Sequence, residues 1–468
     1  MWKDNKHSLY FAFAIIISTS TTILSQNSHI IIRNIVISGN EKTSEKVIYK
    51  ELDFKKGDTI PLESLSALMY KNNGRLESKK IFNKSNINIK NWDNATNEVD
   101  VYITLQENWF IYPYPILELA DRNFNVWRKE HNYNFNRLNY GAGIKHINLS
   151  GMDDALAIKV HGGYSTKVDL SYEYPYLLKS WGLSTDFSLT NNNEFGYISQ
   201  GNVLKFYKNE NEQTLLKQLK ASIAIHNRSS STIFQRLSLG YIHAKLLDDF
   251  DITLNPNYFA PNKKSLSIFF LEYLLKIDRT TYPLYPIEGI RGELSLKHEG
   301  FKNEIQTSHA VLNLETFVPI VKNLFISNAL RFKYNFQSKP IPFYLYKGIG
   351  YDNNSIMGYQ LYVFESKDYF IVNNALTYKL LDKDFNMMSW VPRQFKTLNI
   401  KAFLSAKFDV GYANDPYYGH LNPLSNTLQY GYGLGFDIVP FNISTFSAIY
   451  GFNKLGEKSW YFSADLSF

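Results

Sequence analysis

The chain has 468 residues, no cysteine and a formal net charge of +7, from 50 Lys and Arg against 43 Asp and Glu. Aromatic residues make up 16% of it, yet its mean hydropathy is only -0.28, so the apolar residues must be dispersed. Beyond the N-terminus no run of about 20 apolar residues occurs, which excludes a helical membrane protein. The lack of cysteine excludes disulfides, thiol chemistry and a lipidated cysteine.

Residues 1–25 have the outline of a secretory signal peptide. Lys3 and Lys6 precede an apolar stretch from Leu9 to Ile17, and small or polar residues follow as far as Ser25. The apolar part is too short to span a membrane as a mature helix. The pattern therefore predicts export with cleavage near Ser25, and the alternative is an uncleaved anchor.

Residues 29–107 have the texture of a small α+β domain in the order β-α-α-β-β. A residue able to cap a helix follows the first strand, and a Lys-Gly-Asp turn separates two helices with apolar residues at helical spacing. The charges of this segment roughly balance, so no nucleic-acid partner is expected. The predicted elements are strands over Ile30 to Ser38, Phe82 to Ile89 and Val99 to Leu105, and helices over Glu45 to Leu52 and Leu62 to Lys79.

This order and its residues resemble a POTRA domain, the periplasmic module of the BamA/TamA superfamily of outer-membrane barrels. The matching residues lie in the turns that follow the first strand and the first helix, and are Gly39, Asn40, Thr43, Gly57 and Asp58. The resemblance implies contact with clients or partners in the periplasm. An exposed strand edge would serve this purpose, because it can add an extended segment through backbone hydrogen bonds.

From residue 108 to residue 468 the sequence alternates apolar with polar or small residues. Many runs reach the roughly 9 to 11 residues that cross a bilayer as tilted strands, whereas soluble sandwiches use strands of about five or six. Length therefore favours a transmembrane antiparallel β-barrel. We expect about 16 strands, an even number typical of single-chain barrels, and omit the short run Val203 to Tyr207. The clearest runs are Leu324 to Phe336, Asn399 to Tyr412 and Leu428 to Val439.

The C-terminal strand carries a barrel signal. Trp460, Phe462, Leu466 and Phe468 share one face, while polar and small residues share the other. In bacterial outer-membrane barrels such a strand closes the cylinder and is the address read during insertion.

A long loop between Phe336 and Tyr369 contains the segment Ile356-Met357-Gly358-Tyr359, and five candidate strands follow it. Its position is similar to that of the superfamily's inward-folded sixth extracellular loop, whose tip reads hydrophobic-Arg-Gly-aromatic. The segment Phe408-Asp409-Val410-Gly411 is similar to the Phe-x-Asp-x-Gly strand motif of the lumen wall. The resemblance implies that the acidic group faces the lumen and receives the loop arginine.

Met357 stands where that arginine would be, and methionine offers packing but no ion pair. Asp409 would then pair with Lys401 or Lys407, or be solvated in a wider lumen. We expect the loop to enter the barrel through Gly358 and Tyr359 and to be held less tightly.

No constellation for covalent chemistry is evident. The histidines show no paired-ligand spacing, no Gly-x-Ser-x-Gly elbow occurs, and Gly431-x-Gly433-x-Gly435 alternates through a predicted strand, where glycines relieve crowding. No enzyme activity, metal or cofactor is expected.

The sequence therefore predicts a protein of the outer membrane with its POTRA-like domain in the periplasm. The resemblance implies that it assists insertion or translocation of protein or lipid substrates. Its partners would be outer-membrane lipid, unfolded or nascent outer-membrane or secreted proteins, and periplasmic or lipoprotein factors. The alternative is a passive or ligand-specific channel, which Met357 favours because a loosened loop would open the lumen.

Overall fold

The computed structural model describes residues 29–466, apart from 179, 209–213, 231, 249, 282–284, 302–304, 338, 352–353, 387–396 and 442–443. The predicted signal peptide and Phe468 lie outside the described residues. The chain divides into two compact units, Met1–Trp109 and Phe110–Phe468, and each is described by itself. Within the described residues no helix has both the length and the apolar character needed to cross a membrane.

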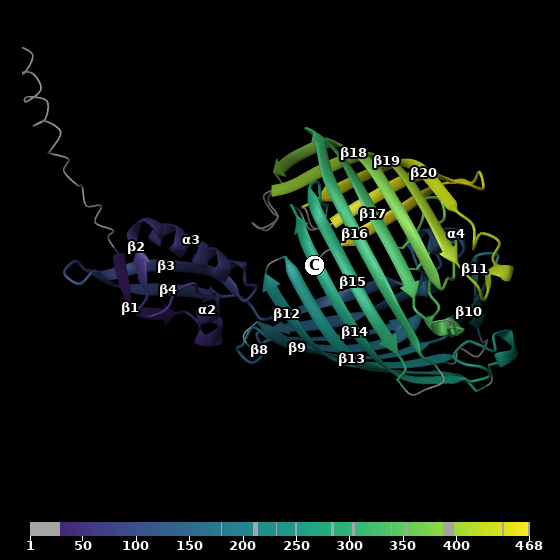
Figure 1. The fold of residues 1–468 in the computed structure, drawn as a ribbon, viewed down its shortest axis with the longest axis horizontal. Coiled ribbons are helices and arrows are strands. Elements are labelled where there is room, and N and C mark those ends of the chain that lie inside the picture. The colour runs from purple at the N-terminus through teal and green to yellow at the C-terminus, as the bar shows by residue number, and fades with distance from the viewer. Residues whose placement is uncertain are drawn as a thin grey trace, which may run out of the picture. The chain divides into compact units, whose positions relative to one another are not determined.

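The first unit is the predicted α+β domain: the three strands and two helices of the predicted β-α-α-β-β order are found, and a short strand, β2, that was not predicted lies between the helices. Its sheet has the order β2-β1-β4-β3, with β1 parallel to β4 and the other pairs antiparallel. Strand β3 therefore lies at one edge of the sheet (Figure 1). The elements are β1 (His29–Ser38), α2 (Glu45–Glu51), β2 (Thr59–Pro61), α3 (Leu62–Ser78), β3 (Phe82–Asp93) and β4 (Glu98–Glu107).

The second unit is a single sixteen-stranded antiparallel sheet that curls into a barrel, as predicted (Figure 1). Strands that follow one another in the chain are neighbours in the sheet, except that β10 (Glu194–Gln200) and β11 (Val203–Lys208) form a separate hairpin between β9 and β12. The short run that was omitted from the strand count belongs to this hairpin. The barrel strands are β5 (Ile111–Leu119), β6 (Leu138–Ile147), β7 (Ala155–Gly163), β8 (Ser165–Leu178), β9 (Trp181–Asn192), β12 (Leu216–Ser230), β13 (Ile233–Leu246), β14 (Ser265–Thr280), β15 (Gly289–Glu299), β16 (Thr307–Val321), β17 (Leu324–Asn335), β18 (Asp368–Asn386), β19 (Thr397–Asn414), β20 (Gln429–Pro440), β21 (Ser444–Asn453) and β22 (Lys458–Leu466).

Side chains alternate between the outside and the inside of the barrel wall. In β20, Tyr432 and Leu434 are exposed on the outside, whereas Gly433 and Asp437 face the interior and are buried. This apolar outer face suits hydrocarbon, and the small and polar inner face suits a lumen.

The two ends of the barrel differ. Long connections gather at one end, which we call the loop end: residues 120–137, 193–215, 247–264, 336–367 and 415–428. The opposite end, with mostly short connections, is the turn end. At the loop end residues of four of these connections, all except 120–137, pack into one buried apolar cluster that includes Phe250, Phe259, Phe343, Tyr346 and Tyr418. Residues far apart in the chain therefore cover this end of the lumen together.

Candidate functional site

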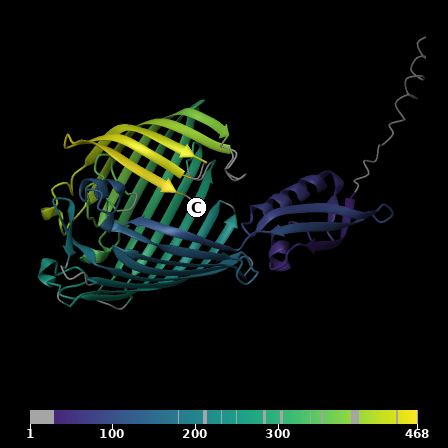
Figure 2. The same ribbon diagram turned by 180° about the vertical axis from the view of Figure 1, so that it is seen from behind.

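The barrel sheet ends in two edges, β5 and β22, and we call the line between them the seam. Within the described residues no hydrogen-bonded ladder joins them: the sheet runs from β22 to β5, and each pairs with its other neighbour alone. Figure 2 shows the blue first strand of the barrel and the yellow C-terminal strand as separate edges. The wall is therefore weakest along this line.

Strand β5 cannot complete a ladder along the seam. The carbonyl of Phe110 accepts from the Ile147 amide at 2.8 Å, and the Ala120 amide donates to the Arg137 carbonyl at 2.9 Å. Because backbone groups alternate in direction along a strand, even-numbered residues of β5 point toward β6 and odd-numbered residues point toward the seam. Pro113 and Pro115 are odd-numbered and carry no N–H, so two donors are missing from the seam edge.

A short helix, α4 (Phe124–Lys129), lies against the edge of β22 at the loop end. The Phe462 amide donates to Asn125 Oδ1 at 2.9 Å, and Asn125 Nδ2 donates to the Phe462 carbonyl at 3.2 Å. The Arg128 guanidinium donates to the Trp460 carbonyl. Side chains of the helix thus bind backbone groups of β22 that point away from β21.

Of the residues of the predicted C-terminal signal, Trp460, Phe462 and Leu466 lie in β22. Trp460 is 51% exposed and Phe462 is 38% exposed, both on the outer face, and Leu466 ends the strand. The ring of Phe462 lies 6.4 Å from that of Phe124 in α4. Tyr461 points inward, and its hydroxyl donates to the Gly358 carbonyl at 3.1 Å. The last strand therefore contacts both α4 and the loop inside the barrel.

The tip of the long loop, Ile356 to Tyr359, is buried against β19, β20 and β21. The Met357 amide donates to Asp409 Oδ2 at 2.9 Å, and Asn453 Nδ2 donates to the Gly358 carbonyl at 3.0 Å. The Tyr359 hydroxyl donates to Gln429 Oε1 at 2.8 Å. The structure thus brings the loop segment and the wall motif together.

Glycines on three adjacent strands form the groove that holds this tip. A Cβ atom at Gly431 would lie 1.8 Å from the Met357 carbonyl oxygen, and one at Gly411 would lie 2.5 Å from Ile356 Cδ1. A Cβ atom at Gly451 would lie 3.0 Å from Met357 Sδ. The loop approaches the wall so closely that side chains at these positions would displace it.

Neither expected environment of Asp409 is found. Its side chain is buried, with the residue 5% exposed, so it is not solvated, and no ion pair joins it to a lysine or arginine within the described part of the chain. The backbone amide of Met357 is its partner instead. Every residue at position 357 except proline offers this backbone donor. The absence of an arginine there therefore could not indicate whether the contact with Asp409 forms. Phe408, which was grouped with the lumen wall, directly precedes Asp409 and is 48% exposed on the outer face, as alternation along a strand requires.

The loop is also bound to the connection that carries α4. Arg122 donates to the carbonyls of Gly350 at 2.7 Å and Leu361 at 3.0 Å, and Asn123 Nδ2 donates to the Gln360 carbonyl at 2.9 Å. Asn123 also caps α4, since its Oδ1 accepts from the Val126 amide. The seam helix and the inserted loop therefore form one bonded assembly.

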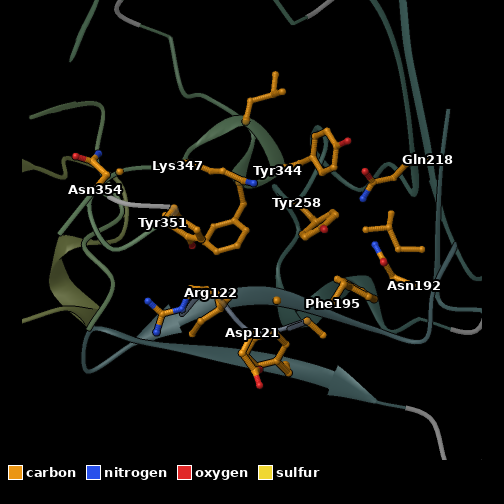
Figure 3. A pocket seen from close by; sticks show the side chains of 18 of the residues that line it. Asp121, Arg122, Asn192, Phe195, Gln218, Tyr258, Tyr344, Lys347, Tyr351 and Asn354 are labelled. Carbon is orange, nitrogen blue, oxygen red and sulfur yellow. The ribbon is translucent and has the colours of Figure 1, made fainter. Parts of the chain in front are cut away.

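A cavity of about 900 Å³, lined by both polar and apolar side chains, lies beneath the loops, and Figure 3 shows Arg122, Lys347 and Tyr351 around it. In the loop beside it, burial raises the pKa of Glu365 to about 8, and the Tyr351 hydroxyl donates to this carboxyl group. Within the described residues no group of three or more potential metal ligands gathers.

The predicted turn residues of the first unit serve its backbone. Gly39 has φ +83° and Gly57 has φ +88°, and a Cβ atom at Gly39 would lie 1.9 Å from the Leu105 carbonyl oxygen. Asn40 Nδ2 donates to the Thr43 carbonyl at 3.0 Å, and the Asp58 carboxylate accepts from the Lys55 amide at 2.9 Å. These residues shape the turns of the domain.

A groove of about 530 Å³ lies between α3 and the edge strand β3. Met69 and Tyr70 line it from the helix, and Ile87 and Ile89 line it from the strand. Tyr70 is 83% exposed. A groove with both apolar and polar lining residues beside a strand edge offers side-chain contacts and backbone hydrogen bonds to an extended peptide.

A β-α-α-β-β domain, followed by a sixteen-stranded barrel whose long loop folds inward, defines the class of barrels that carry POTRA domains. More particularly, the combination of the two units resembles the fold of BamA/TamA-type proteins. Residues 30–108 match the POTRA family, described as surface antigen variable number repeat.

The whole chain is similar in fold to two solved structures. The crystal structure of BamA from Haemophilus ducreyi lacking POTRA domains 1–3 matches with a TM-score of 0.61 and 16% identity, over 93% of this chain and 85% of that one. CdiB from Acinetobacter baumannii matches with a TM-score of 0.52 and 15% identity, over 94% of this chain and 74% of that one. A search of curated protein sequences finds no match.

Two parts of the seam were missed in the sequence. Pro113 and Pro115 stand at alternate positions of the first barrel strand, and this signal of an edge strand was available. Helix α4 has six residues and no long apolar periodicity, so the sequence carried little more than the capping Asn123 to indicate it.

Proposed function

We propose that this protein resides in the outer membrane, with its POTRA domain in the periplasm, and assists the insertion or translocation of protein substrates. The observation that carries the proposal is the seam between β5 and β22, which lacks a ladder and faces two prolines. Each backbone hydrogen bond broken in hydrocarbon is costly, so a wall that opens sideways needs a line along which few must break.

The POTRA domain supplies the first contact in this mechanism. An unfolded client would add to the edge of β3 as a strand and place an apolar side chain in the groove beside Tyr70. It would then pass to the seam, whose open edge accepts a strand in the same way. The process involves binding and pairing with no covalent step, so we assign no enzyme activity.

The packed loop end supports this function over a passive channel. The apolar cluster of the long connections covers the loop end, and the inserted loop tip lies against the inner wall, so both stand in the path that a solute would take along the barrel axis. A client that leaves through the seam does not need that path.

The proposal is tested by depleting the protein in its native host and measuring the outer-membrane proteome quantitatively. Complementation with Tyr70→Ala should lower client levels several-fold, because the exposed ring in the groove is lost. Tyr49→Ala is the matched control, since Tyr49 is an exposed aromatic residue of the same domain on α2 and does not line the groove. An unchanged proteome together with altered uptake of small solutes would favour the channel instead.

A further inference from the structure

The edge of β22 that faces the seam is defined by the hairpin that precedes it. The Asn453 amide donates to the Glu457 carbonyl at 3.1 Å, so odd-numbered residues of β22 bond to β21. Even-numbered residues therefore turn their N–H and C=O groups toward the seam. Along this edge, Trp460 and Phe462 lie toward the loop end, and Ala464 and Leu466 lie toward the turn end.

Asn125 binds this edge as a backbone would. A primary amide offers one carbonyl acceptor and an N–H donor, as a peptide group does. It uses both on one residue: it accepts from the Phe462 amide at 2.9 Å and donates to the Phe462 carbonyl at 3.2 Å. Arg128 adds a donor to the Trp460 carbonyl, one step of the strand repeat away. These are the groups that a neighbouring antiparallel strand would bond.

From this geometry we propose that α4 is a built-in competitor for the seam edge of β22, and that an incoming extended strand must displace it to pair there. The proposal rests on the proposed function, because it names what controls access to the same seam. The partner is an extended segment with alternating apolar side chains, since Trp460 and Phe462 present an apolar outer face beside the edge.

Helix α4 has the properties of a displaceable element. It contains six residues, and a helix this short is not stable in isolation. Its position depends on the contacts with β22 and on the bonds that Arg122 and Asn123 make to the inserted loop. Displacement of α4 would therefore also remove support from that loop.

Competition predicts opposite effects from releasing and from locking the helix. The probe is a fluorescent peptide with the sequence of residues 458–468, measured by anisotropy against full-length protein in nanodiscs. In Asn125→Ala/Arg128→Ala we expect about tenfold tighter peptide binding, because the fraction of protein with an available edge rises. The amide of Phe462 should also exchange with solvent faster, which hydrogen exchange would detect.

The absence of native cysteine permits a clean lock. A Phe124→Cys/Phe462→Cys pair, joined by a short reducible cross-linker, should abolish peptide binding until the linker is cleaved. The matched control is Phe124→Cys/Tyr133→Cys, because these rings lie 6.3 Å apart within the α4 connection, against 6.4 Å across the α4–β22 contact. In this control, peptide affinity should be the same before and after the linker is cleaved.

Peptide affinities within about twofold of each other in the released, locked and wild-type proteins would overturn the proposal. So would unchanged exchange of the Phe462 amide after release. Failure of the proposed function is distinguishable: if α4 controls peptide binding while depletion leaves the outer-membrane proteome unchanged, the competition stands and the function does not. If clients are lost on depletion while peptide affinity is the same in the released, locked and wild-type proteins, only the proposed competition by α4 is wrong.

Discussion

Replacement of Pro113 and Pro115 together by valine should close the seam. Both prolines turn their nitrogen toward the seam and lie in the first five residues of β5, which begins at the turn end, where β22 finishes with Ala464 and Leu466. Valine restores two N–H donors and favours extended backbone. At about 0.5–1.5 kcal/mol net for each hydrogen bond, two bonds give about 1–3 kcal/mol, a shift of about 5- to 150-fold toward the paired edge.

Hydrogen exchange and client assembly would measure this effect. The Ala464 amide, which points toward the seam, should exchange more slowly in the double variant, and client levels in cells should fall. Pro319→Val is the control, because Pro319 lies in β16, which pairs on both sides within the sheet. Unchanged exchange at Ala464, or normal client levels with a slowed amide, would refute the reasoning that missing donors keep the seam available.

Three further predictions concern the inserted loop. Asp409→Leu leaves the buried Met357 amide without its acceptor and should cost about 1–3 kcal/mol, seen as faster proteolysis of the loop, whereas Asp409→Asn keeps an oxygen and should lose less. Gly431→Ala should displace the tip and give the same proteolysis, while Gly292→Ala, whose Cβ would meet ordinary contacts, should not. Burial raises the pKa of Glu365 to about 8 from 4.5. The contribution of its neutral carboxyl group to the free energy of unfolding is therefore complete below about pH 4.5 and is lost as the pH rises through about 8. Glu365→Gln should flatten this pH dependence of the unfolding temperature.

Equal proteolysis of the Asp409→Leu and wild-type proteins would mean that the loop is held elsewhere. A Gly431→Ala protein that protects its loop like the Gly292→Ala protein would show that the groove is wider than the Cβ distances indicate. An unfolding temperature with the same pH profile in Glu365→Gln and wild type would remove Glu365 as the titrating group.

The sequence predicted the architecture well because alternation and strand length are properties of local segments. The β-α-α-β-β order and the sixteen strands follow from such patterns, and the resemblance indicated that the loop tip and Asp409 belong to matching motifs. The partner of Asp409 could not be predicted, because a backbone amide leaves no mark in the side-chain sequence. Likewise, Asn125 binds Phe462 in β22, 337 positions further along the chain, and no local sequence pattern predicts that contact.

The position of the loop tip in the chain has a consequence for biogenesis. The tip is synthesised before the strands that hold it, since Met357 precedes Asp409 in β19, Asn453 in β21 and Tyr461 in β22. The tip therefore lacks these hydrogen-bond partners until the C-terminal strands have been added. The hydroxyl of Tyr461 can bind the Gly358 carbonyl only once the last strand is in place. The full set of contacts that holds the tip is therefore complete only when the barrel wall itself is complete.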